Sequence, residues 1–458
     1  MKLIDKDLMS MQEVRELVES AKEAQRELAR MDQAQVDRIV KSIADAGVRN
    51  AKRLAQMAQE DTGFGVVSDK VVKNVFASRG VYEHIKDMKT IGEIERDDEK
   101  GLRKIAVPVG VIAGLIPSTN PTSTAFYKSE IAIKSGNAIV FSPHPTALRA
   151  IMETVKVIRQ AIAEAGANEN LVSCISIPTM EATSTLMHHR DIALILATGG
   201  SAMVKAAYSS GTPAIGVGPG NGPAYLEKTC DLPLAVKRIM DSETFDNGTI
   251  CASEQSIICD EDMAEAVQAE MERQGAYFLD EQEREQLGRF ILRANGTMNP
   301  EIVGKSVKTI ASLAHLDKVP ADARVLIAKE TGVGRGHPYS NEKLGPIMAF
   351  YTGKDYIDVC EKVCTILYYE GAGHTFSMHT KDDKMVDYFA KRVPASRIMV
   401  NTPSALGGIG ATTNLQPSLT LGCGAVGGSA TSENVGPLQL LNYRYVAYGQ
   451  RELEDIKA

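Results

Sequence analysis

The sequence predicts an α/β protein built from two doubly wound domains. From residue 108 onward, short apolar segments alternate with helical segments, and turns rich in Gly, Ser and Pro separate them. Such alternation is typical of parallel sheets whose strands are joined by crossover helices. A length of 458 residues exceeds what one core usually holds and favours two to three domains. Because Trp is absent and Phe and Tyr are few, the core must consist mainly of Ala, Val, Ile, Leu and Met.

The amino-terminal part is predicted to begin with amphipathic helices. Apolar residues recur at helical spacing in 11–30, 33–60 and 70–87, so one face of each helix should be buried. A terminal helix of this kind either packs on its own domain, which is the commoner case, or docks a partner. Strands are then predicted at 109–116, 138–142, 171–177, 192–198 and 214–217, and helices at 122–135, 146–165, 181–188 and 201–210.

The second half of the chain is predicted to hold another α/β domain. Helices are expected at 261–274 and 280–293, and a strand near 325–328. Two helix–strand units near 354–368 and 384–400 would complete its sheet. The segment 404–428 is so rich in Gly, Ser and Thr that we expect an irregular loop lining a cleft.

Two distant segments are predicted to form a small antiparallel ribbon. Residues 89–107 contain two strand-like stretches around a charged turn at 97–100. Residues 438–448 form a last apolar strand, which should pair with them.

The composition excludes several classes of function. The net charge of −7 gives no basic surface for nucleic acid. Seven cysteines at irregular spacings predict no disulfide framework and indicate a reducing compartment. No apolar segment suits a signal peptide or a membrane span, so we expect a soluble, cytoplasmic protein with no membrane partner. No clustered His and Cys ligands occur, and no metal is predicted.

Cys251 is the best candidate for a nucleophile. It lies in a short polar loop, 245–255, that contains Gly248 and leads into an apolar strand-like segment. A reactive thiol must be accessible and partly ionised, and such a loop provides access and backbone N–H groups near the sulfur. The alternative is that Cys251 is a small buried apolar residue, which is the commoner fate of a free cysteine.

Three polar turns follow predicted strands, at 117–121, 142–145 and 198–201. Ligands of parallel sheets bind beyond the carboxyl ends of the strands, so these turns should line one crevice. The turn at 198–201 also opens a helix, whose free N–H groups favour a phosphate. The glycine-rich segment 216–222 does not spell the dinucleotide signature, and the Gly-Lys-Ser at 304–306 lacks the rest of a phosphate-binding loop.

Four separated motifs together resemble the aldehyde dehydrogenase family over nearly the whole chain. They are Pro-x-x-Asn-Pro at 117–121, Asp-Asn-Gly-x-x-Cys at 246–251, Glu-Lys-Leu-Gly-Pro at 342–346, and the turn into a helix at 198–204. Further segments resemble the CoA-acylating branch, especially the aldehyde dehydrogenase half of bifunctional aldehyde-alcohol dehydrogenases and the aldehyde dehydrogenases of bacterial microcompartments. Those segments are 62–65, 116–121, 142–145, 216–221, 251–255 and 418–424. The iron-dependent alcohol dehydrogenase half is not expected in this chain.

The resemblance implies an aldehyde dehydrogenase-like fold with a small β oligomerisation flap. An NAD-binding Rossmann-like domain would comprise 1–88 and 108–223, and a catalytic domain 224–436. The strands of 89–107 and 437–458 would mediate oligomerisation. A homodimer or a dimer of dimers is then expected, with microcompartment shell or cargo proteins as further partners if the enzyme is encapsulated.

The same resemblance implies a reaction: aldehyde + NAD⁺ + CoA ⇌ acyl-CoA + NADH + H⁺, with acetaldehyde, propionaldehyde or butyraldehyde as the substrate. Cys251 would attack the aldehyde, and the Asn120 amide with the Cys251 backbone N–H would hold the oxyanion. Hydrolytic members carry a glutamate where this chain has Gly216, and that glutamate activates water. A CoA thiol is intrinsically nucleophilic and needs less help, so the missing carboxylate favours thioester formation.

The implied cofactor is NAD, with NADP as the alternative and coenzyme A as the co-substrate. Glu342 would bind the nicotinamide ribose, unless it is a surface residue at a turn. His374 would contact CoA or the acyl group, unless it is structural. The complete set of predicted cofactor-binding residues is Ile116, Pro117, Ser118, Thr119, Ser142, Pro143, His144, Pro145, Thr198, Gly199, Gly200, Ser201, Gly216, Val217, Gly218, Glu342, Leu344 and His374.

Two other functions remain open at this point. One is a hydrolytic aldehyde dehydrogenase whose base comes from elsewhere, for example Glu254. The other is a non-catalytic cargo or assembly protein of a microcompartment that acts through the helix near 9–30 or the last strand. The combination of Asn120, Cys251 and Glu342 argues against the second.

Overall fold

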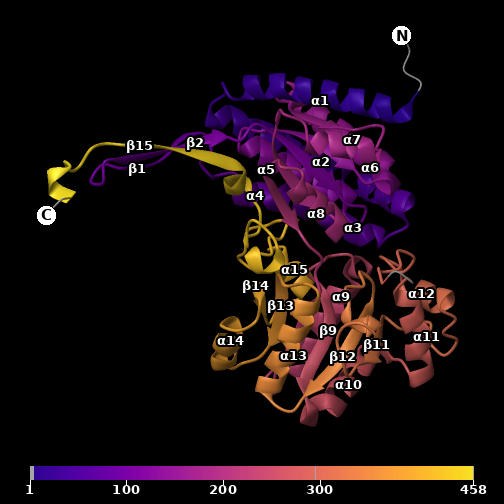
Figure 1. Ribbon diagram of the computed structural model, residues 1–458. Coiled ribbons are helices and arrows are strands. Elements are labelled where there is room, and N and C mark those ends of the chain that lie inside the picture. The colour runs from indigo at the N-terminus through magenta and orange to yellow at the C-terminus, as the bar shows by residue number, and fades with distance from the viewer. Residues whose placement is uncertain (1–4, 294–295, 457–458) are drawn as a thin grey trace.

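Three β-sheets organise the chain in a computed structural model that describes residues 5–293 and 296–456. Two of the sheets are parallel and form the centres of two lobes, and the third is an antiparallel ribbon that extends away from both (Figure 1). The predicted α/β fold is confirmed at this level, and nothing in the structure conflicts with the predicted β flap. The division of the chain into domains stays a prediction, and the second lobe's first strand begins at Gly222, before the expected boundary.

The first lobe is built on a five-stranded parallel sheet of order β5-β4-β3-β6-β7. The strand order reverses between β3 and β6: β4 and β5 are added on one side of β3, and β6 and β7 on the other. Ligands of α/β sheets bind at such a point. Every residue of β3 and β4 is buried, as expected for strands covered on both faces. The elements are β3 (Val111–Ile116), α5 (Pro121–Lys134), β4 (Ala138–Pro143), α6 (Leu148–Glu164), β5 (Val172–Cys174), α7 (Met180–Met187), β6 (Ile192–Thr198), α8 (Ser201–Ser209) and β7 (Ala214–Val217).

The amino-terminal helices pack on this same lobe. They are α1 (Lys6–Leu28), α2 (Gln33–Thr62), α3 (Val67–Val75) and α4 (Val81–Ile85). The apolar stripe of α1, including Val14, Val18 and Leu28, is buried in the core that contains the five-stranded sheet. Packing on its own lobe therefore accounts for the amphipathic pattern of this helix, and no partner is needed to explain it.

The second lobe is built on a seven-stranded parallel sheet of order β10-β11-β12-β9-β8-β13-β14. Its strands are β8 (Gly222–Leu226), β9 (Glu254–Asp260), β10 (Ala276–Phe278), β11 (Val325–Lys329), β12 (Ile347–Gly353), β13 (Gly373–His379) and β14 (Ala395–Val400). Its helices are α9 (Leu232–Thr244), α10 (Ala264–Arg273), α11 (Glu281–Ile291), α12 (Val307–Leu313), α13 (Tyr356–Tyr369), α14 (Asp383–Ala390) and α15 (Ser404–Gly408). Apart from α15 and short turns, 404–428 is irregular, as predicted.

The third sheet pairs β1 (Gly92–Asp97) and β2 (Leu102–Pro108) with β15 (Leu441–Ala447). The predicted pairing of the last strand with the hairpin is thus confirmed. The ribbon projects from the first lobe as an arm whose tip carries the last described residues (Figure 1).

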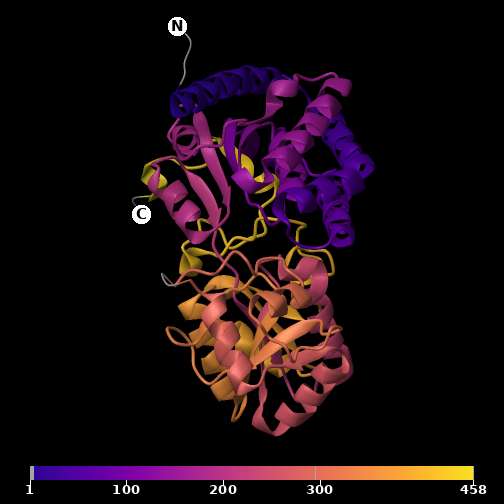
Figure 2. The same cartoon turned by 90° about the vertical axis from the view of Figure 1, so that its right-hand side faces the viewer.

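The two lobes meet along a band of loops (Figure 2). The Asn120 side chain, just after β3, donates to the Thr249 carbonyl, which precedes β9. A second contact joins Thr198, the last residue of β6, to Thr420. The cysteine loop therefore lies at the carboxyl edge of the first sheet.

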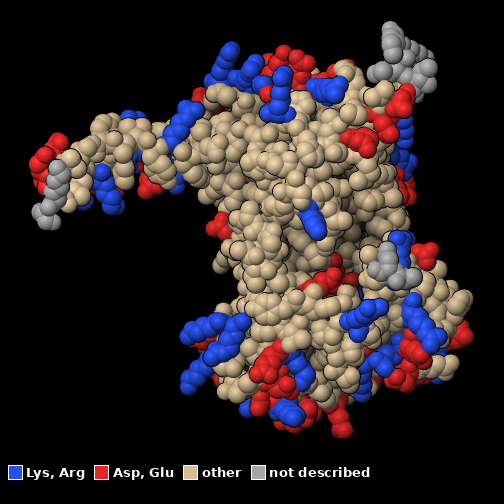
Figure 3. Space-filling model, viewed as in Figure 1, with Lys and Arg blue, Asp and Glu red and all other residues tan. Residues whose placement is uncertain are grey.

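Charged side chains gather at the two ends of the molecule on the face drawn in Figure 3. Both signs are mixed there, and the surface of the first lobe between them is largely uncharged, so this face carries no continuous basic area. Within 5–293 and 296–456, no helix is both long and apolar enough to cross a membrane.

Candidate active site

Cys251 lies in the turn between α9 and β9, preceded by the short helical segment Phe245–Gly248. Its side chain is partly accessible, and its Sγ atom lies 3.2 Å from the Nε2 atom of His374. Burial, followed by the negative charge of Glu342, raises the pKa of the Cys251 thiol to about 12. The guanidinium of Arg397 and the backbone N–H of Cys251 act in the opposite direction on this pKa. The thiol is therefore protonated at neutral pH and needs a proton acceptor to become a nucleophile.

His374 is well placed to be that acceptor. It is buried in β13, and its Nδ1 atom lies 2.9 Å from the hydroxyl oxygen of Thr375. Burial and the nearby Arg397 lower the pKa of the His374 imidazole to about 3, so the ring is neutral at physiological pH. In the tautomer that donates from Nδ1 to Thr375, the Nε2 lone pair faces the Cys251 thiol.

Asn120 is the N-cap residue of α5, between the two lobes. Its amide nitrogen donates to the Thr249 carbonyl and to the Thr119 hydroxyl, each at 3.2 Å. Its amide oxygen accepts from the ammonium group of Lys73 at 2.7 Å. The donor end of this amide thus points toward the loop that carries Cys251, two residues after Thr249.

Gly220 and Glu342 adjoin the nucleophile from the other side. A Cβ atom at Gly220 would lie 1.7 Å from the Cys251 carbonyl oxygen, so only glycine fits. The Gly220 N–H donates to the Glu342 carboxylate at 2.8 Å. Burial, with Glu370 second, raises the pKa of Glu342 to about 8. Leu344 adopts a left-handed conformation with φ of 47°, and its carbonyl accepts from the Gly304 N–H at 2.8 Å.

The predicted cofactor residues after β3 and β4 lie side by side at the carboxyl edge of the sheet. The Ile116 carbonyl accepts the His144 N–H at 3.1 Å, which ties the two turns together. Pro117, Ser118 and Thr119 are partly exposed, and Ser142 is buried against the Thr183 hydroxyl at 2.8 Å. Pro143 is also buried, whereas His144 and Pro145 are exposed.

The turn after β6 leaves a helix end open. The first turn of α8 is not capped by any side chain of the described residues, and its N-cap is Gly200. A Cβ at Gly200 would meet nothing within 4 Å, and one at Gly199 would meet only Met203 at 3.9 Å. Ser201 is exposed, and the Thr198 hydroxyl lies 3.2 Å from that of Thr420. Uncapped N–H groups beside open space suit the diphosphate of a dinucleotide.

The structure gives Gly216 a different setting from the one predicted. Gly216 is buried in β7, its N–H donates to the Tyr208 hydroxyl, and its carbonyl accepts from Tyr208 and Ser429. A Cβ there would lie 2.7 Å from Val204. The position faces α8 and has no free polar group for a cofactor. Val217 is buried as well, whereas the Gly218 N–H contacts the thiol of Cys423.

Several functional candidates were missed from the sequence. Arg397 is buried in β14 and donates to the carbonyls of His374 at 2.9 Å and Gly422 at 2.7 Å. Lys70 and Lys73 of α3 are buried against Asp246. In the sequence, Arg397, Lys70 and Lys73 are each a positively charged side chain beside an apolar neighbour. Neither hydrophobic periodicity nor motif matching detects such a residue. No group of three or more metal-ligating side chains occurs in the described parts of the chain.

Comparison with known proteins places these features in a family. Aldehyde dehydrogenase is the family that matches, over residues 3–308. The bifunctional aldehyde-alcohol dehydrogenase AdhE of Escherichia coli K12 is 46% identical over 440 residues, which cover 95% of this chain and 49% of that protein. The chain thus spans about half the length of this relative.

Two solved structures extend the comparison. An acetylating aldehyde dehydrogenase from Geobacillus thermoglucosidasius has a TM-score of 0.97 at 50% identity, covering 98% of this chain and 99% of that one. A propionaldehyde dehydrogenase from Rhodopseudomonas palustris, with bound CoA and an acylated cysteine, has a TM-score of 0.85 at 28% identity, covering 95% and 97%. The chain belongs to the aldehyde dehydrogenase family.

Proposed function

We propose that this chain oxidises a short-chain aliphatic aldehyde to an acyl-CoA, reversibly, with NAD as the hydride acceptor and a thioester on Cys251 as the intermediate. The single observation that carries the proposal is the pair formed by Cys251 and the neutral His374, at 3.2 Å. The Asn120 amide nitrogen contacts the same loop, at the Thr249 carbonyl two residues before Cys251. A nucleophile, a proton acceptor and an oxyanion donor are the three parts that acyl transfer through a thiol requires.

The side chains suggest how the nucleophile forms and is stabilised. His374 Nε2 takes the proton of the Cys251 thiol as sulfur attacks the aldehyde carbon, which gives a hemithioacetal. The oxyanion of this adduct accepts from the Asn120 amide nitrogen and the Cys251 N–H. One such donor contributes about 10²–10³ in rate. The partly buried setting strengthens these hydrogen bonds because little water competes for them.

The chain offers groups that fit NAD. The uncapped start of α8 suits the diphosphate, and the Glu342 carboxylate suits the ribose hydroxyls. Bound there, the nicotinamide would supply the hydride acceptor. We favour NAD over NADP because of the likeness to the bifunctional enzymes, and the residues of 142–145 contribute no lysine to the adenosine ribose.

The absence of a carboxylate base at Gly216 favours the CoA thiol over water as the acyl acceptor. The two residues on either side of Gly216, Ile215 and Val217, are apolar, and Glu254 points elsewhere: its carboxylate accepts the Ser404 N–H at 3.0 Å. Water is a weak nucleophile and a slow acceptor without a carboxylate base, whereas a CoA thiol is intrinsically nucleophilic. Once His374 has released the first proton to solvent, it can take the thiol proton as CoA attacks the thioester and Cys251 leaves. The R. palustris relative, which binds CoA and carries an acylated cysteine, supports this step.

We further propose the setting in which the enzyme works. The chain would function in the cytoplasm, free or inside a bacterial microcompartment, with its NAD-binding lobe at 1–88 and 108–223 and its catalytic lobe at 224–436. The arm, from 89–107 and 437–458, would join subunits into a homodimer or a dimer of dimers. An exposed two-edged ribbon supports the last point, because unpaired strand edges are normally covered.

The test withholds CoA. With aldehyde and NAD alone, we expect one rapid burst of NADH per active site and then a slow phase, because hydrolysis is about 10²–10⁴ slower when no carboxylate base activates the water. Added CoA should restore steady turnover, with acyl-CoA as the product. Steady acid formation without CoA would favour the hydrolytic alternative, and a chain that forms no NADH under either condition would favour the non-catalytic one.

A further inference from the structure

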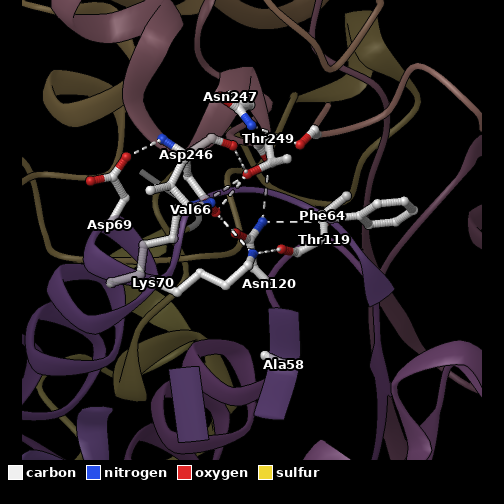
Figure 4. Close-up of polar contacts among 12 residues, drawn as sticks. Ala58, Phe64, Val66, Asp69, Lys70, Thr119, Asn120, Asp246, Asn247 and Thr249 are labelled. Carbon is white, nitrogen blue, oxygen red and sulfur yellow. Dashed lines mark hydrogen bonds and ion pairs between the residues drawn. The ribbon is translucent and has the colours of Figure 1, made fainter. Parts of the chain in front are cut away.

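A buried cluster of charge joins three parts of the chain behind Asn120. Lys70 and Lys73 of α3 are each 3% exposed, and both reach the carboxylate of Asp246, which is wholly buried. The Lys73 ammonium lies 2.5 Å from Asp246 Oδ2 and that of Lys70 lies 3.0 Å from it. Figure 4 shows Lys70 and Thr249 against Asp246, with Asn120 next to Thr249 and Thr119.

Lys73 is the member that touches the site. Its ammonium donates to the Asn120 amide oxygen at 2.7 Å and to the Thr249 hydroxyl at 2.8 Å. An ammonium group has donors and no acceptor, so the atom of Asn120 that faces it must be the oxygen. The amide nitrogen is then forced to the opposite side, where it donates to the Thr249 carbonyl.

We propose that Lys73 is a positioning residue for the reaction: it fixes the orientation of the Asn120 amide so that the nitrogen, and not the oxygen, is presented to the oxyanion on Cys251. This inference rests on the proposed function, in which Asn120 is an oxyanion donor. A flipped amide would place a carbonyl oxygen against the oxyanion and repel it. A cation on the amide oxygen also polarises the amide and makes its N–H groups stronger donors.

Asp246 holds this cation in place and connects it to the nucleophile loop. Asp246 and Asn247 both have positive φ, 50° and 53°, in the turn that leads to Cys251. The Val66 N–H donates to Asp246 Oδ1 at 2.7 Å. A Cβ at Gly65 would lie 1.8 Å from the same oxygen, so glycine is required for this close approach. One carboxylate thereby locks α3, Asn120 and the cysteine loop into one frame.

Stability alone is a poor explanation for the cluster. Two buried ammonium groups share one carboxylate, and burial lowers the pKa of Lys73 to about 8 even though Asp246 opposes the shift. Apolar side chains of similar size commonly replace such buried charges at no cost to stability. The geometry around Asn120 accounts for a donor-only group at this position, whereas an apolar core would not need one.

The test is a double-mutant cycle on the burst of NADH in a single turnover, with the full chain, NAD and acetaldehyde. Asn120→Ala should slow the burst about 10²–10³-fold. Lys73→Met should slow it by about tenfold or more, because a misoriented amide stabilises the oxyanion poorly. The double variant should be no slower than Asn120→Ala alone, since Lys73 acts only through Asn120. The alkylation rate of Cys251 by iodoacetamide should be the same in all of them.

Lys70→Met is the matched control. It removes a buried cation from the same helix and the same carboxylate, but Lys70 donates to the Thr119 carbonyl and not to Asn120. Any slowing of the burst by Lys70→Met should therefore be independent of the slowing by Asn120→Ala, so the two factors should multiply in the double variant. Lys73→Gln, which keeps a hydrogen bond to Asp246, is carried through the same cycle in case Lys73→Met fails to fold.

The outcomes separate two failures. A normal burst in Asn120→Ala would remove the oxyanion role from Asn120, and the proposed function would lose that part. A slow burst in Asn120→Ala would support the oxyanion role. If the losses of both Lys73 variants then multiplied with the loss of Asn120→Ala in the double variants, the positioning role would be overturned and the proposed function would stand.

Discussion

The Nε2 atom of His374 lies 3.2 Å from the Sγ atom of Cys251, and the pKa values of the two groups place the shared proton on sulfur. Burial raises the pKa of the thiol to about 12 and lowers that of the imidazole to about 3. The resting site therefore holds a neutral pair and not a thiolate–imidazolium ion pair. The nucleophile forms only as the proton moves during attack.

This neutral pair predicts how alkylation depends on pH. Iodoacetamide reacts with the thiolate, whose fraction grows about tenfold per pH unit at any pH well below the thiol pKa. The alkylation rate of Cys251 in the cofactor-free protein should thus rise continuously between pH 6 and pH 9, with no plateau. A plateau near pH 7 would mean that the thiol is already ionised there.

The His374 variant tests the proton acceptor itself. His374→Ala should slow NADH formation about 10²–10⁴-fold, whereas His188→Ala, at an exposed residue, should not.

Replacement of the nucleophile gives the most direct test of the site. Cys251→Ala should abolish turnover and leave the fold and NAD binding intact, because it removes only the reacting sulfur. Cys259→Ala is the control, since Cys259 is buried in an apolar cluster of β9 and has no contact with the site. Cys423 is a poorer control because it influences the pKa of Cys251. NADH formation by Cys251→Ala at the unmodified rate would remove the assignment.

Gly216→Glu should not turn the enzyme into a hydrolase. A side chain at this position would meet Val204 at 2.7 Å and Tyr208 at 2.9 Å, so the carboxylate cannot be placed beside Cys251 without moving α8. We expect a loss of stability of about 1–3 kcal/mol from overpacking, measured by chemical denaturation. Acid production in CoA-free buffer should stay as slow as in the unmodified protein. A stable variant that makes acid steadily would show that the strand can rotate the new carboxylate toward the thiol.

The sequence predicted those parts of the molecule that leave a local pattern. Strand and helix alternation predicted all five strands of the first sheet, because each element there buries a continuous apolar face, although β5 (Val172–Cys174) is shorter than the expected 171–177. Cys251, Asn120 and Glu342 lie in short motifs whose residues stay adjacent when the chain folds. By contrast, β8 was missed because Gly222 and Pro223 open a strand that is buried in the middle of a sheet, where composition no longer signals it.

Long-range pairing explains the remaining misses. Lys73 and Asp246 are far apart in the sequence and meet only because two lobes dock, so helical spacing alone could not reveal their ion pair. The surroundings of Gly216 have the same origin, since Ser429 and α8 close around it. His374 was left with two interpretations because its neighbour Cys251 lies in a turn far away in the sequence, just before β9.

The arm predicts self-association. β15 lies at one edge of the ribbon, and its Tyr445 and Val446 side chains are exposed, which leaves an unpaired apolar strand edge in the isolated chain. Light scattering at micromolar concentration should give the mass of a dimer or of a dimer of dimers. Val446→Lys should shift that mass downward because a charge at a closely packed strand edge opposes pairing, whereas Lys100→Ala in the exposed turn should not. A monomer mass for the unmodified chain would contradict this interpretation of the ribbon.

Glu254 predicts an unusual dependence of stability on pH. It is wholly buried, one of its carboxylate oxygens has no partner among the described residues, and burial raises its pKa to about 7. In the unfolded chain the pKa is about 4.3, so between these values the folded state holds a proton that the unfolded state has released. The stabilisation from this group is therefore complete below about pH 4 and is lost as the pH rises to about 7.

Glu254→Gln should remove that loss. The free energy of unfolding of the variant, relative to the unmodified protein, should grow by roughly 2–3 kcal/mol between pH 5 and pH 8, as measured by chemical denaturation. Glu281→Gln is the control: Arg284 lowers the pKa of Glu281, so both its folded and unfolded forms are ionised above about pH 5 and the difference should stay constant across this range. A difference for Glu254→Gln that stays constant across this range would mean that Glu254 is ionised in the folded protein, and Glu254 would then regain its place as a candidate base.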